Sequence, residues 1–79
     1  MDFSEALRAL KQGVRVQRQA WLSDSNEIAL ELDREANPQL IELIYPVGSQ
    51  SFPEGKTIYW HPQQEDLLAT DWLALGGTY

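Results

Sequence analysis

The sequence contains no cysteine and a single histidine. A disulfide framework and a zinc site built from cysteine and histidine are therefore both excluded as ways of stabilising the chain. Its 79 residues make a single domain, residues 1–79. A domain of this size buries only about 60% of the surface that the unfolded chain exposes. Because small domains need an additional stabilising device, we expect this one to associate with copies of itself.

Basic residues are also scarce, with 6 Lys and Arg against 12 Asp and Glu and a formal net charge of −6. This balance argues against nucleic-acid polymers and anionic membrane surfaces as partners, because both require a basic footprint. No apolar run approaches the roughly 18 residues of a membrane-spanning helix. The first residues, MDFSE, do not resemble a signal peptide. We therefore expect a cytoplasmic protein.

The N-terminal segment has the pattern of an amphipathic helix. Asp2 and Glu5 have the spacing of a capping box, and Gly13 stands where a helix commonly ends. Between them, apolar residues recur at the spacing of one helical face: Phe3, Ala6, Leu7 and Leu10. The pattern predicts a helix over residues 3–12 that packs these side chains on the rest of the domain.

The remaining sequence predicts a small sheet and a second helix. Alternation around Val16 and over 28–33 predicts two strands, and apolar segments predict three more, over 40–45, 57–60 and 72–75. Between the strands we expect a long, mobile hairpin loop over 46–55 and a helix over 62–69 with Pro62 in its first turn. After the last strand we expect a frayed tail over 76–79. The predicted class is α+β: an N-terminal helix packed on a small, mostly antiparallel sheet, with a short second helix before the last strand.

Two of the predicted strands are apolar on both faces, namely 40–45 and 57–60. A small antiparallel sheet with one wet face should alternate instead. These strands are either central and covered on both sides, or they face another subunit. A domain this small can hardly wall a drug-sized pocket of about 300–1,000 Å³ unaided, so we expect any ligand site to lie at a subunit interface.

Residues for catalysis are in short supply. His61 lies between Trp60 and Pro62 with no serine or cysteine motif nearby, and no glycine-rich phosphate-binding loop is present. One histidine among scattered carboxylates makes a weak metal site. We therefore expect a protein that is not an enzyme and that carries no metal or cofactor.

Aromatic residues and one arginine give the best candidates for ligand binding. Trp21 and Trp60 adjoin loops, where an indole can stack on a nucleobase or fill the core, whereas Trp72 lies in an apolar strand typical of core. Arg18 is suited to an anion, or else to a salt bridge with Asp66 or Asp71. The candidate ligand-binding residues are Arg18, Trp21, Trp60, Asp66 and Asp71.

Two segments of the sequence resemble a known family. The chain opens with MDFSEALRALKQG, followed by Val16, Arg18 and Trp21, and residues 60–72 read WHPQQEDLLATDW. These blocks are similar to the M-x-F-x-x-A-L-x-x-L-K-x-G, R-x-x-W and W-x-P-[ST]-Q-x-D-[LM]-L-A-x-D-W patterns of the Thoeris anti-defence protein two family of phages and bacteria. Residues 22–57 depart from the family, whose members usually carry W-N-G-K-G-M after the first strand.

The resemblance implies a function as well as a fold. Characterised family members are α+β homotetramers that bind glycocyclic ADP-ribose, the immune signal made by bacterial TIR enzymes, without cleaving it. Some also take up cyclic dinucleotides. We therefore expect a non-catalytic module that sequesters nucleotide-derived signals in the cytoplasm of a bacterial host, as a homodimer or homotetramer. The alternative is a structural or protein-interaction module of phage or prophage origin with no small-molecule ligand.

Overall fold

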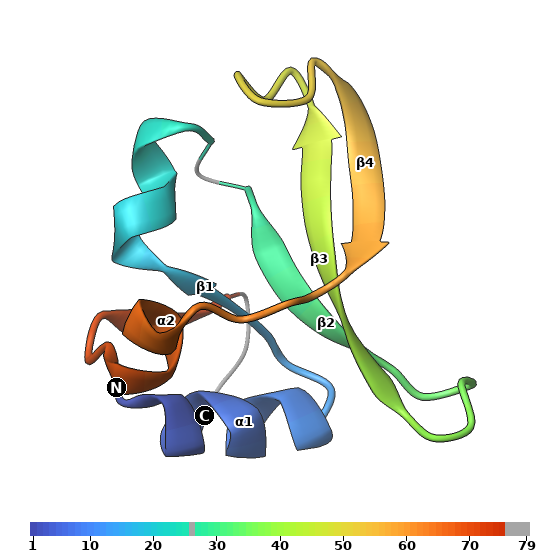
Figure 1. Cartoon of the computed structure of the whole chain (residues 1–79), viewed down its shortest axis with the longest axis vertical. Helices are drawn as coiled ribbons and strands as arrows, with labels where there is room; N and C mark the ends of the chain where they lie inside the picture. The colour runs from blue at the N-terminus through green and yellow to red at the C-terminus, as the bar shows by residue number, and fades with distance from the viewer. Residues whose placement is uncertain (26, 76–79) are drawn as a thin grey trace.

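The computed structural model describes residues 1–25 and 27–75. Five strands form one sheet in the order β4-β3-β2-β1-β5, and every neighbouring pair is antiparallel. Figure 1 labels strands β1 to β4 and both α-helices. The α+β class is confirmed, as is the short second helix before the last strand. The elements in chain order are α1 (Phe3–Lys11), β1 (Arg15–Arg18), the 3-10 helix η1 (Gln19–Ser23), β2 (Ala29–Asp33), β3 (Leu40–Val47), β4 (Glu54–Tyr59), α2 (Gln64–Leu68) and β5 (Trp72–Leu75).

The ends of α1 are fixed as the sequence predicts. The Asp2 carboxylate accepts a hydrogen bond from the Glu5 amide at 2.9 Å, and the Glu5 carboxylate accepts one from the Asp2 amide at 3.3 Å. This reciprocal pair is a capping box, which satisfies two amides that the first helical turn leaves free. At the other end Gly13 has a φ of 85°, a conformation that glycine adopts without steric cost.

The buried stripe of α1 contains Ala9 in place of Leu7, and Phe3 packs against the core while staying half-buried. Ala6, Ala9 and Leu10 are buried against β1, β2 and β5, whereas Leu7 is only half-buried. The prediction that Leu7 packs in the core was therefore wrong. Residues 6, 9 and 10 have the i, i+3, i+4 spacing of a helical face, and Leu7 lies on its flank.

One face of the sheet forms the core with α1. Val16 lies opposite Leu30 of β2 on one side and Ala74 of β5 on the other, so these side chains point to the same face. Val16, Leu30 and Trp72 are each no more than 1% exposed and pack with Leu10 of the helix. The described residues include no helix that is both long and apolar enough to cross a membrane.

The β3–β4 hairpin is longer than the sequence suggests. β3 runs to Val47 and pairs there with Glu54, so the loop shrinks from the predicted 46–55 to 48–53. Pro46 was expected to end the strand, but its fixed φ is compatible with strand geometry. Gly55 has a φ of 82°, and a Cβ there would lie 3.3 Å from the Tyr45 carbonyl oxygen. The close approach of the two backbones therefore requires glycine.

Strand β4 is an edge of the sheet, so the interpretation of residues 57–60 as a central, covered strand was wrong. Ile58 is 37% exposed and Tyr59, on the opposite face, 50% exposed. The strand ends at Tyr59, although the Trp60 amide still donates to the Ile41 carbonyl at 2.8 Å. The other interpretation, contact with a second subunit, stays a prediction.

The segments around the two short helices differ in detail from the prediction. Residues Gln19–Ser23 form η1. The sequence did not predict this helix, because turn-forming residues follow it directly. Helix α2 starts at Gln64, so Pro62 lies outside its first turn. The Asp66 carboxylate accepts a hydrogen bond from the amide of Gln63, the residue that precedes the helix. The predicted frayed tail, 76–79, lies outside the described residues.

Candidate functional site

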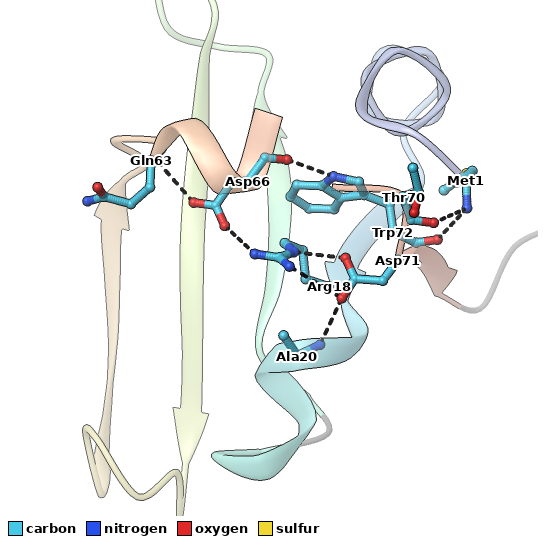
Figure 2. Close-up of polar contacts among 8 residues, drawn as sticks. All are labelled: Met1, Arg18, Ala20, Gln63, Asp66, Thr70, Asp71 and Trp72. Carbon is cyan, nitrogen blue, oxygen red and sulfur yellow. Dashed lines mark hydrogen bonds and ion pairs between the residues drawn. The ribbon is translucent and has the colours of Figure 1, made fainter. Parts of the chain in front are cut away.

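Arg18, the last residue of β1, is the centre of an ion-pair cluster. Its Nε lies 2.9 Å from Asp71 Oδ1 and its Nη1 2.8 Å from Asp66 Oδ1, while Nη2 donates to Asp71 Oδ2 at 3.4 Å (Figure 2). The Arg18 side chain is only 14% exposed. The salt-bridge interpretation of Arg18 is therefore confirmed, and with both acidic partners.

Backbone contacts hold the two carboxylates in place. Asp66 Oδ2 accepts from the Gln63 amide at 3.0 Å, and the Asp66 carbonyl accepts from Trp72 Nε1 at 3.0 Å (Figure 2). Asp71 Oδ2 accepts from the Ala20 amide at 3.2 Å. The cluster thus ties α2, the start of β5 and η1 to the end of β1.

The amine of Met1 secures the segment between α2 and β5. It donates to the carbonyl oxygens of Thr70 at 3.3 Å and Trp72 at 3.0 Å (Figure 2). The Met1 carbonyl in turn accepts from the Trp72 amide at 3.1 Å. Asp71, between these two residues, is thereby kept within reach of Arg18.

Electrostatics favour the charged state of this cluster. The hydrogen bond from Arg18 lowers the pKa of Asp71 below its usual range, and the same contact raises the pKa of Arg18. Both groups are therefore ionised at neutral pH. Because one guanidinium faces two carboxylates, the cluster carries an excess of negative charge.

Two tryptophans, Trp21 and Trp60, pack against the third, Trp72, beside this cluster. Trp72 is 1% exposed and lies in the core, as its apolar strand predicts. Trp21 meets it edge-on with ring centroids 5.4 Å apart, and Trp60 does so at 5.9 Å. Trp21 and Trp60 are half-buried, so each also presents indole surface outside the core.

A cavity of about 520 Å³ lies between η1, the β3–β4 hairpin and the start of α2. The connection from β4 to α2 crosses the sheet (Figure 1), and it contributes Trp60 and His61 to the cavity lining. Four of the five candidates line the cavity: Arg18, Trp21, Trp60 and Asp66. Asp71 does not line the cavity, but it forms an ion pair with Arg18, which does. Residues of one chain line this cavity, which is partly open to solvent. The expectation that a ligand site lies at a subunit interface stays a prediction.

The β3–β4 hairpin contributes residues to the cavity that the sequence analysis did not identify. Leu43, Tyr45 and Ile58 line it together with His61. Leu43 lies opposite Ile58 in the β3–β4 register, so one sheet face supplies these side chains. Residues 43 and 45 alternate with 42 and 44 along the strand and therefore share a face with Ile41. Because the strand is apolar on both faces, its sequence does not indicate which of these two sets faces the cavity.

Asp24 fixes the tip of the hairpin to the end of η1. Its Oδ1 accepts from the Gln50 amide at 2.6 Å and from the Ser51 amide at 3.1 Å, and the Ser51 hydroxyl donates to its Oδ2. The hydrogen bond from Ser51 lowers the pKa of Asp24. Asp24 lines the cavity, so this contact sets the position of one wall.

Within the described residues, no group of three or more His, Cys, Asp or Glu side chains is placed to hold a metal ion.

The chain matches known proteins along most of its length. The model of the Thoeris anti-defense 2-like domain matches residues 1–75. Thoeris anti-defense 2 of Bacillus phage SP01 is 32% identical to this chain in an alignment that covers 91% of each protein. The chain therefore belongs to the Thoeris anti-defense 2-like domain family.

Proposed function

We propose that this protein is a phage anti-defence module that binds a small nucleotide-derived signal and sequesters it without cleaving it. Membership of the anti-defense family supports the anti-defence role. Support for the ligand class comes from one observation, the cavity of about 520 Å³ flanked by the indoles of Trp21 and Trp60. Its volume fits a drug-sized ligand, and indoles provide stacking surfaces for a base.

The surroundings of the cavity favour binding over chemistry. The carboxylates that hold Arg18 also accept backbone hydrogen bonds, so their lone pairs are engaged in the fold. His61 lines the cavity, but within the described part of the chain no side chain hydrogen-bonds to its ring. A general base normally needs such an orienting partner. The proposal therefore assigns no catalytic residue, no cofactor and no metal.

A thermal-shift panel tests the proposal. The probes are cyclic ADP-ribose, ADP-ribose, NAD and cyclic dinucleotides. A ligand at 100 times its dissociation constant stabilises a one-site protein by about 2.7 kcal/mol, which raises the Tm of a small domain by several degrees. We expect at least one cyclic nucleotide to do so, and Ile58→Glu, which places a charge in the cavity, to abolish the shift.

Leu68→Glu is the matched control for this variant. Leu68 is 80% exposed on α2 and does not line the cavity, so its replacement should leave the shift unchanged. If no probe raises the Tm of the wild-type chain, the sequestration proposal fails. The alternative, a structural or protein-interaction module with no small-molecule ligand, would then account better for the exposed apolar residues.

We also propose that the protein associates with copies of itself through the sheet face opposite α1. Leu40, Tyr59 and Leu73 point to that face and are 39%, 50% and 39% exposed. Gln17, which pairs with Leu73 across the sheet, is buried there. Large exposed apolar side chains on one face favour a self-complementary contact, for which two-fold pairing is the commonest symmetry.

Light scattering at micromolar concentration tests this association. We expect a dimer or tetramer for the wild-type chain and a shift towards monomer for Tyr59→Glu, which adds charge beside Glu42 in the same cross-strand row. A folded wild-type protein with the mass of a 9.0 kDa monomer would contradict the proposal.

A further inference from the structure

The cavity has an unusual distribution of charge for a site that binds a nucleotide. Among its described lining residues, Arg18 is the only lysine or arginine, and acidic residues outnumber it: Asp24, Glu65 and Asp66. Arg18 is already held by Asp66 and Asp71. A phosphate that displaced Asp66 would leave a carboxylate on a side chain that is 9% exposed without its guanidinium partner. Removal of one partner from a buried ion pair is strongly unfavourable.

A second cation lies at the hairpin end of the same sheet face. Lys56 of β4 is the cross-strand partner of Tyr45, which lines the cavity, and it precedes the lining residue Ile58 by two positions. Side chains two apart on a strand share a face, so Lys56 points to the same side of the hairpin as the cavity. Lys56 does not itself line the cavity and lies opposite Tyr45, nearer to the hairpin tip than Ile58.

The ammonium of Lys56 is held by an aromatic ring. Its Nζ lies 4.8 Å from the centroid of the Phe52 ring, and that ring packs edge-on against Tyr45 with centroids 4.6 Å apart. Within the described part of the chain, no carboxylate forms an ion pair with Lys56. A cation–π contact leaves the N–H groups of an ammonium available for an anion.

We propose that Lys56 binds the phosphate-bearing end of the ligand, while Arg18 stays in its ion pairs and serves the fold. The ligand's flat ring then lies towards Trp21 and Trp60, and its phosphates lie towards Tyr45 and the hairpin. This inference rests on the proposed function and adds to it the orientation of the ligand and a residue that determines specificity for charge. It also reassigns the anion contact that the sequence suggested for Arg18.

Isothermal titration with two probes tests the inference. The probes are cyclic ADP-ribose, which carries phosphates, and adenosine, which does not. Charge-assisted hydrogen bonds are among the stronger polar contacts, so Lys56→Gln should weaken binding of cyclic ADP-ribose by about tenfold or more. It should leave the affinity for adenosine unchanged, and Lys56→Arg should retain most of the affinity for both.

Lys11→Gln is the matched control, because Lys11 is the other lysine of the sequence and lies at the end of α1, away from the lining residues. We expect this variant to bind both probes like the wild-type chain. Unchanged affinity of Lys56→Gln for cyclic ADP-ribose, or an equal loss for both probes, would overturn the inference and leave the proposed function standing. A wild-type chain that binds neither of these two probes nor any other nucleotide of the thermal-shift panel would refute both.

Discussion

The Nε of Arg18 lies 2.9 Å from Oδ1 of Asp71, directly beside the point where β1 and β5 pair through Arg18 and Trp72. The same carboxylate accepts from the Ala20 amide at the start of η1. A single ion pair therefore fixes three elements relative to one another. Because η1 carries Trp21, the contact also sets the position of one cavity wall.

Replacement of Arg18 should destabilise the fold strongly. Arg18→Ala leaves Asp66, whose side chain is 9% exposed, without its cationic partner. We expect the free energy of unfolding to fall by about 2–5 kcal/mol, as is typical when one partner of a buried pair is removed. Urea denaturation followed by tryptophan fluorescence measures this change.

The control for Arg18 is Arg15, whose ion pair with Glu31 has side chains that are 50% and 47% exposed. Exposed pairs contribute about 0–1 kcal/mol, so Arg15→Ala should have a much smaller effect than Arg18→Ala. Equal effects of the two substitutions would show that the Arg18 cluster does not secure the fold.

Stability should fall in acid because of Asp71. Its pKa is lowered in the folded state, so Asp71 stabilises the fold above the ordinary aspartate value of about 3.9. That contribution is lost as the pH falls through the lowered folded pKa. We expect Asp71→Asn to melt below the wild-type chain at pH 7 and the two melting temperatures to converge below about pH 4. A constant difference down to pH 3 would contradict this assignment.

Two glycines of the hairpin should differ in their tolerance of alanine. Gly48 and Gly55 both have positive φ, 93° and 82°, but a Cβ at Gly48 meets no atom within 4 Å. Gly48→Ala should therefore cost only the strain of the backbone conformation, about 1–2 kcal/mol. Gly55→Ala adds a backbone contact at 3.3 Å and should lower the Tm further. Indistinguishable melting curves would mean that the two backbones do not approach so closely.

Leu10, and not Leu7, should anchor α1. Leu10 is 1% exposed within the core cluster, so Leu10→Ala should cost about 2–5 kcal/mol. Leu7 is half-buried on the flank of the helix, and Leu7→Ala should cost clearly less. Chemical denaturation of the two variants gives the comparison, and the reverse order would refute the position of the helix.

Local signals in the sequence predicted much of the fold. The capping box at Asp2, the glycine at position 13 and the alternation around Val16 each depend on near neighbours, and each is confirmed. The hairpin was predicted less well, because Pro46 and Gly55 are turn-forming residues that the strands accommodate. Their tolerance depends on cross-strand pairing, which the sequence does not display.

The candidate site was predicted on one side and missed on the other. Arg18 and Asp66 lie in segments with distinctive chemistry, and their pairing follows from the parity of β1 and the acidity of the C-terminal segment. Tyr45 and Ile58 come from strands that are apolar on both faces, so periodicity could not show which residues face the cavity. Only the register of β3 and β4 settles that question.

Sequestration without cleavage is the central claim, and recovery of the bound ligand tests it most directly. The wild-type protein is incubated with cyclic ADP-ribose, separated from free ligand by filtration and denatured by heat, and the released ligand is measured by chromatography. The account predicts that the ligand is retained with the folded protein and released unchanged. Release of a cleavage product, or no retention of this ligand or of a cyclic dinucleotide under the same conditions, would contradict it.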